Sequence, residues 1–215
     1  MTEYLGATPI NDNEIPPHLF SVCKGWRMMA SALGHNGPVA WTIPPGLWLY
    51  DIPKLGPCYQ DFNYVIRGWR YHDYPYPTHS VVFWIPKVIE LPKKWHRINS
   101  GLTGHSDDPT IELRERFQLP AHHLQNFGNA ALIAALALGE FHRSGIRTPL
   151  DNYWVMTDAY MAGYGGSIRL GHFDDRGLDC DYWGDYGTGH DNFNRADRRN
   201  HVMGRFPIGV ERLDP

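Results

Sequence analysis

Cysteine is scarce in this chain, and the few cysteines form no recognisable pattern. Cys23, Cys58 and Cys180 are the three cysteines among 215 residues, and none belongs to a CxxC pair. An odd and scattered set indicates neither a disulfide framework nor a structural zinc ribbon. The sequence therefore favours a reducing compartment, and we expect a cytoplasmic protein.

Long apolar runs and a basic excess are also missing. The longest apolar run, residues 130–139, falls well short of the roughly 20 residues that a membrane-spanning helix needs. The N-terminal segment has neither the basic nor the apolar region of a signal peptide. The formal net charge is −3 and there are five lysines, so the chain lacks the positive field that attracts nucleic acid. We therefore expect neither a membrane nor a nucleic acid as partner.

The sequence signatures of several common enzyme classes do not occur. The chain contains no GxSxG, HExxH, Walker A or GxGxxG motif. These motifs mark α/β-hydrolases, zinc peptidases and nucleotide-binding folds. None of those classes is therefore indicated by a motif.

The overall composition is that of an ordered globular protein, with 42% hydrophobic, 20% charged and 13% aromatic residues. The 22 glycines and 17 prolines are spread along the chain, which indicates many turns and short elements. The length fits one globular domain, which we place at residues 17–215 after an extended N-terminal arm at residues 1–16.

Two segments have the apolar pattern of helices. Apolar residues recur at three- and four-residue steps over residues 17–33, where Pro17 suits a first helical position. Residues 121–143 are predicted as a second helix, apolar nearly all round from 130 to 138 and therefore buried on several sides. We expect its Leu132 and Leu136 to lie in the core.

Short runs rich in aromatic and β-branched residues occupy residues 39–91 and 153–212, as expected for strands. The predicted fold class is therefore α+β. It consists of an antiparallel sheet or partial β-barrel packed against the two principal helices, at about 17–33 and 121–143.

Most residues that suggest chemistry lie near the C-terminus. Residues 172–191 contain two histidines and six aspartates against one arginine, together with several glycines. This composition is typical of loops that present metal ligands. A basic cluster follows at Arg195, Arg198 and Arg199, and it can neutralise the carboxylates without any metal.

The segment YGGSIRLGHFD places His172 and Asp174 in an HxD pattern. It resembles the segment of the 2-oxoglutarate oxygenase family that carries two of the Fe(II) ligands. The resemblance implies His172, Asp174 and a distal His201 as metal ligands, and Arg212 as the anchor of an anionic cosubstrate. In that family several jelly-roll strands separate HxD from the distal histidine, whereas 26 residues separate Asp174 from His201 here.

Two other templates fit part of the same region. Asp179, Asp181 and Gly184 match positions of a calcium loop, but Trp183 and His190 occupy positions where an EF-hand needs oxygen ligands. An irregular calcium or magnesium site that includes Asp185 stays open. A histidine base oriented by an aspartate is the other template, and the sequence neighbours available for it are His190 with Asp191 and His72 with Asp73.

Two function hypotheses follow from these patterns. One is a metal-dependent enzyme, such as a non-haem iron oxygenase-like protein, with Fe, Mn, Zn or Ca at the C-terminal site. The alternative is a non-catalytic structural subunit that contacts a protein partner, or further copies of itself, in a larger assembly.

Overall fold

The structure is a computed structural model that describes residues 6–43, 46–59, 80–91, 109–125, 128–148, 150, 153–161, 166–183 and 202–213. These residues form helices and two largely antiparallel sheets, and this α+β architecture confirms the predicted fold class. None of the helices in these ranges combines the length and apolar character needed to cross a membrane.

The first sheet is antiparallel throughout and joins the two ends of the chain. Its strands, in spatial order, are β1 (Thr8–Pro9), β2 (Ala40–Thr42), β3 (Ser80–Trp84) and β9 (Ile208–Arg212). Strand β9 is an edge strand, paired with β3 so that Val81 faces Glu211 and Trp84 faces Ile208. Because side chains alternate along a strand, Gly209 and Glu211 share one face of this edge.

The second sheet contains the C-terminal hairpin. Its spatial order is β4 (Ile89–Glu90), β8 (Val202–Arg205), β5 (Tyr153–Met161), β6 (Gly166–Asp174) and β7 (Gly177–Trp183). Strands β5 and β8 are parallel, and the other pairs are antiparallel. Pro86 lies between β3 and β4 and cannot donate to a ladder, so the predicted strand run 80–91 divides between the two sheets.

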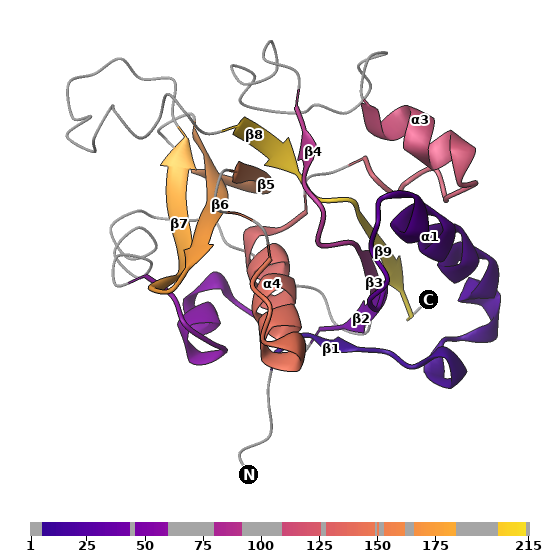
Figure 1. The fold of residues 1–215 in the computed structure, drawn as a ribbon, viewed down its shortest axis with the longest axis horizontal. Coiled ribbons are helices and arrows are strands. Elements are labelled where there is room, and N and C mark those ends of the chain that lie inside the picture. Colours follow the sequence, from indigo (N-terminus) through magenta and orange to yellow (C-terminus); the bar gives the residue numbers. More distant parts are fainter. Residues whose placement is uncertain are drawn as a thin grey trace.

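Helices cover both faces of the first sheet (Figure 1). They are α1 (Phe20–Ala32), α3 (Pro109–Arg116) and α4 (Ala130–Ser144), with 3₁₀ turns η1 (Asp12–Glu14), η2 (Pro17–Leu19) and η3 (Leu49–Lys54). Alternate residues of β3 point to different cores. Val81 and Phe83 pack in a cluster with α1, here called the α1 core, and Val82 and Trp84 pack in a cluster with α4, the α4 core.

Helix α4 is the most deeply buried element, as its apolar sequence predicted. Every residue from Ala130 to Glu140 is buried, and the helix packs on η3, β1, β5 and β6. It begins at Ala130, however, and not at Ala121. The side chain of Asn129 caps it by accepting hydrogen bonds from two backbone amides, and Gly128 before it has φ +91, outside the helical region.

Two further local predictions were wrong. Residues 49–52, part of the run 47–52 that was predicted as strand, lie in the 3₁₀ turn η3, and Pro53 in this turn removes a backbone donor that a ladder would use. Residues 177–183, which lie in the segment predicted as turns and loop, form strand β7 of the β6–β7 hairpin. The buried Leu178 and Cys180 lie on either side of the half-buried Asp179, a strand pattern that the number of carboxylates concealed.

Candidate functional site

Asp174, a ligand predicted from the sequence, is held in a network of hydrogen bonds at the end of β6. Its Oδ2 accepts from the Tyr59 hydroxyl at 2.5 Å and from Arg176 Nη2 at 3.0 Å, and its Oδ1 accepts from the Arg176 amide at 2.8 Å. Burial alone would raise the pKa of Asp174, but these hydrogen bonds outweigh it and hold the pKa at about 2. The Asp174 carboxylate therefore holds the segment that contains Tyr59 against the β6–β7 hairpin.

The other members of the predicted set lie in different surroundings. His172 sits at an irregularity of β6 with φ +45, and its ring meets the edge of Trp154 at a centroid distance of 4.9 Å. Arg212 is exposed at the end of β9 in the first sheet, opposite Ser80. His201 lies outside the described residues. The metal set of His172, Asp174 and His201, with Arg212 as anchor, therefore stays a prediction.

The residues of the other two templates are only partly described. Asp179 and Asp181 lie in the regular strand β7, and Asp179 Oδ1 accepts the Cys180 amide at 2.8 Å. The remaining residues of those templates, and the basic cluster, lie outside the described ranges. These are Gly184, Asp185, His190, Asp191, His72, Asp73, Arg195, Arg198 and Arg199.

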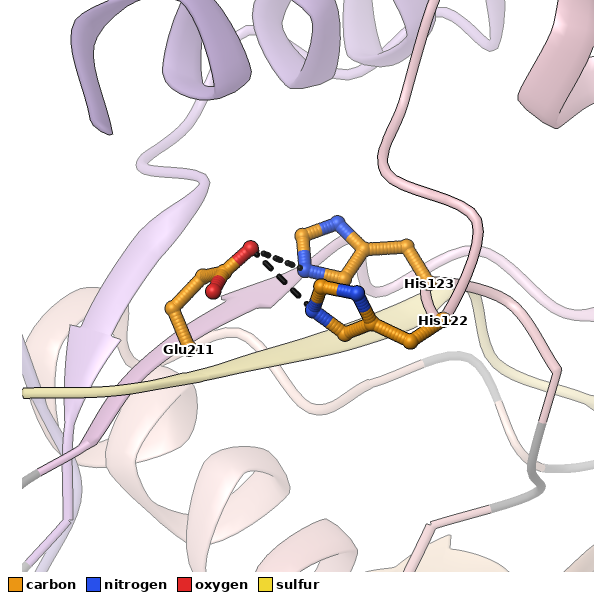
Figure 2. Close-up of side chains that lie close together, drawn as sticks. All are labelled: His122, His123 and Glu211. Atoms are coloured by element: carbon orange, nitrogen blue, oxygen red, sulfur yellow. Dashed lines mark ion pairs between the residues drawn. The ribbon is translucent and has the colours of Figure 1, made fainter. Parts of the chain in front are cut away.

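A different group of histidines and a carboxylate comes together at the edge of the first sheet (Figure 2). Glu211 Oε1 lies 3.2 Å from His122 Nε2 and 3.1 Å from His123 Nε2. The potential ligand atoms of the three residues all lie within 4.8 Å of one another. We call these three residues the His–His–Glu cluster.

The turn that carries the two histidines is fixed to β9 by its backbone. Residues 121–124 form a turn in which Leu124 has φ +60, and the Leu124 amide donates to Ile208 O at 3.0 Å. The Leu124 carbonyl accepts from Thr110 Oγ1 at 3.0 Å and from the fully buried Arg205 at 2.8 Å. These bonds place His122 and His123 beside the strand that carries Glu211.

Glycine at position 209 allows the His123 ring to approach the backbone of β9 closely. A Cβ atom there would lie 2.6 Å from ring atoms of His123, closer than real Cβ contacts come. The His123 ring therefore lies directly on the backbone of β9, on the face that also presents Glu211. It is completely buried in the α1 core beside Trp26 and Phe83.

Trp26 decides which nitrogen of His123 carries a proton. Its indole Nε1–H donates to His123 Nδ1 at 3.0 Å in a buried hydrogen bond. An indole nitrogen can only donate, so Nδ1 is unprotonated and the proton of the neutral ring is on Nε2. Although Nε2 contacts Glu211, it has no hydrogen-bond partner among the described residues, because the carboxylate oxygen lies away from the N–H direction.

The two histidines differ sharply in their access to solvent. Burial, and then the charge of His122, lower the pKa of His123 to about 3. A second proton on this ring would also have to occupy Nδ1, which faces the Trp26 N–H. The side chain of His122 is 57% exposed and that of Glu211 is 19% exposed, so the cluster opens to solvent on one side only.

A separate groove offers a less specific candidate. It has a volume of about 720 Å³ and runs between β1, η1, α1 and residues 35–40, and none of the three cluster residues lines it. Two of its cationic side chains already have partners, since Arg27 pairs with Asp12 and Arg143 pairs with Glu140. The groove therefore presents no unpaired charge from these side chains to a ligand.

Sequence reasoning missed the His–His–Glu cluster because residues 121–129 were predicted to be helical. On a helix, adjacent residues project about 100° apart, so two neighbouring histidines would not be expected to meet one carboxylate. The one available signal was the pair of histidines that begins two residues after Pro120, where a turn is as compatible as a helix.

Two imidazoles and one carboxylate form a donor set that suits Zn, Fe or Mn and leaves coordination positions open. The same atoms without a metal form a carboxylate that orients a solvent-facing histidine. Comparison with protein-family models, curated proteins and solved structures finds no match for this chain.

Proposed function

We propose that the protein binds one divalent transition-metal ion through His122, His123 and Glu211 and acts as a metal-dependent enzyme. The observation that carries the proposal is the proximity of three ligand-type atoms at the edge of β9, all within 4.8 Å of one another. The proposal keeps the two-histidine, one-carboxylate chemistry expected from the sequence and assigns it to other residues.

The distances within the cluster support a metal. Four ligands placed about 2.0 Å from a tetrahedral zinc ion are about 3.3 Å from one another, and the two N–O separations here are 3.1 and 3.2 Å. A hydrogen bond has a similar length, so direction is the better criterion. In a hydrogen-bonded pair the N–H points at the oxygen, whereas His123 Nε2 makes no hydrogen bond to Glu211 Oε1 in spite of their short separation.

The donor types and the exposure indicate which chemistry is available. Imidazole nitrogen favours Zn, Fe or Mn over Ca and Mg, which prefer sets made only of oxygen. Three protein ligands leave at least one position for water or a substrate, and the exposed side of His122 faces solvent. An ion there would polarise a substrate oxygen or supply a metal-bound hydroxide as nucleophile.

We expect metal-free protein to take up one Zn(II) or Mn(II) per chain in calorimetric titration. Removing a partner of a metal ligand usually costs about 10- to 100-fold in affinity, so removing a ligand itself should cost at least about 100-fold. Glu211→Gln and His122→Ala test this loss. His18→Ala, which changes an exposed histidine in η2, is the matched control and should bind as the unaltered protein does.

Asp174→Asn separates the two ligand sets in the same titration. If the ion belongs to the His–His–Glu cluster, this variant keeps its affinity. Loss of binding in Asp174→Asn together with full binding in Glu211→Gln would move the site to the HxD segment. No uptake by the unaltered protein of Zn(II), Mn(II) or Fe(II), the last under nitrogen, would contradict the proposal as a whole.

A second candidate is the structural subunit, which the exposed face of α1 favours. Phe20 and Met28 are each 53% exposed and lie two turns apart on this helix. Large apolar side chains exposed in this way are typical of protein contacts. A protein that takes up no metal but associates with itself or a partner through α1 would fit this function.

A further inference from the structure

We infer that Trp26 controls metal affinity at the His–His–Glu cluster by holding the proton of His123 on the nitrogen that faces the ion. The inference rests on the proposed function and adds a residue that regulates it. Its starting point is the buried hydrogen bond from the Trp26 indole N–H to His123 Nδ1, 3.0 Å long.

The hydrogen bond has the opposite direction from the one that usually supports a metal-bound histidine. A histidine that binds a metal through one nitrogen normally donates the N–H of its other nitrogen to a carboxylate or a carbonyl. Here the group beside Nδ1 is itself a donor and cannot accept. The lone pair of Nδ1 is therefore engaged, and Nε2, the atom 3.1 Å from Glu211, carries the hydrogen.

Coordination by Nε2 requires that this proton move. Neutral imidazole has one N–H, so binding an ion at Nε2 removes the proton there and places a proton on Nδ1, with no net release. Nδ1–H would then face the indole N–H, and two donors cannot share a hydrogen bond. The metal must therefore displace the Trp26 contact, and its affinity is lowered by the loss of that contact.

Trp26 cannot simply turn aside. Its side chain is completely buried, and its ring stacks on Phe83 at a centroid distance of 5.9 Å. The ring also meets the edge of His123 itself. Close packing of this kind leaves no free rotamer nearby, so moving the indole N–H away from Nδ1 costs free energy that metal binding must supply.

The expected consequence is a site that holds its ion weakly and exchanges it readily. Trp26 is a positioning residue, because it acts on the ion only through His123. Removing its N–H while keeping an aromatic ring should free Nδ1 to take the proton and tighten metal binding. The usual influence of residues that contact metal ligands predicts a gain of about 10- to 100-fold.

The test compares Zn(II) and Mn(II) titrations of Trp26→Phe with those of Trp41→Phe. Trp41 is equally buried, and its indole nitrogen has no hydrogen-bond partner in the described part of the chain. Both variants lose the same part of a buried indole, so a packing effect on affinity would appear in both. Only Trp26→Phe should bind more tightly than the unaltered protein.

Long-range ¹⁵N–¹H spectra of the histidine rings supply a readout that a structural role would not change. In the metal-free protein His123 should show a proton on Nε2, and in the metal-loaded protein a proton on Nδ1. If Trp26→Phe does not fold, β-(3-benzothienyl)alanine at position 26 keeps the shape of the indole and replaces the N–H by sulfur. The same titrations then apply to that protein.

The outcomes separate this inference from the proposed function. Tighter binding in Trp26→Phe, with unchanged binding in Trp41→Phe, supports the inference. Equal or weaker binding in folded Trp26→Phe, with normal binding by the unaltered protein, overturns the inference and leaves the metal site intact. No binding by the unaltered protein overturns the proposed function and the inference with it.

Discussion

Leu136→Ala is expected to lower the free energy of unfolding by about 2 to 5 kcal/mol, the usual cost of a truncated core leucine. Leu136 is completely buried in α4, and Leu132, one turn earlier, is 1% exposed. Both belong to the α4 core, which contacts strands of both sheets. Close-packed neighbours relax only partly into the cavity left by the missing atoms, so the cost should fall in the upper part of this range.

Urea denaturation monitored by tryptophan fluorescence measures the loss. Leu213→Ala provides the control, because Leu213 is 40% exposed after β9 and its truncation leaves no cavity. We expect that variant to unfold within about 0.5 kcal/mol of the unaltered protein. Equal midpoints for Leu136→Ala and Leu213→Ala would show that α4 does not form the centre of the protein.

The burial of α4 could be predicted because its sequence has a single interpretation. Nine successive apolar residues from 130 to 138 leave no polar face for solvent, so a helix with this sequence must be covered on all sides. Cys23 and Trp26 in α1 follow the same logic, since they recur at helical spacing and are both buried. An apolar pattern of this kind indicates only which side of a single helix or strand is buried.

The start of α4 could not be predicted from apolar spacing alone. Residues 121–129 contain enough apolar side chains to continue the pattern, but Asn129 and Gly128 favour a cap and a positive φ. In the β6–β7 hairpin, the aspartates and glycines conceal the alternation of strand residues. At such positions turn chemistry and strand pairing compete, and contacts with distant residues decide the outcome.

The His–His–Glu cluster could not be predicted from the sequence for a related reason. A motif is a set of residues at fixed sequence spacing, whereas this cluster joins a turn to the edge of a sheet formed by the last strand of the chain. Glu211 faces the histidines because β9 pairs with β3 in one register, in which Glu211 lies opposite Val81. A shift of one residue would turn Glu211 to the other face of the sheet.

Gly177→Ala is the second substitution with a large expected effect, about 2 to 5 kcal/mol of lost stability. Gly177 has φ +117, which alone costs a residue with a side chain about 1 to 2 kcal/mol. A Cβ atom there would also lie 2.6 Å from backbone atoms of Pro57 and Cys58. Backbone cannot rotate away as a side chain can, and such overlap costs typically about 1 to 3 kcal/mol more.

Gly145→Ala separates the two contributions. Gly145 ends α4 with φ +69, and a Cβ atom there would meet nothing within 4 Å. This variant should therefore show only the conformational cost. The additional loss in Gly177→Ala measures the contact between the hairpin and the segment at Pro57.

The same contact controls the surroundings of Asp174. The Leu178 amide donates to Pro57 O at 2.9 Å and the Tyr59 amide to Leu178 O at 3.0 Å, and these bonds bring the Tyr59 hydroxyl to Asp174. If Ala at position 177 pushes the segment away, the amides of Leu178 and Tyr59 should exchange hydrogen faster, while those of α4 remain protected. Equal stability losses in Gly177→Ala and Gly145→Ala, with no faster exchange at Tyr59, would show that the segment does not pack on the hairpin and that Tyr59 does not hold Asp174 in place.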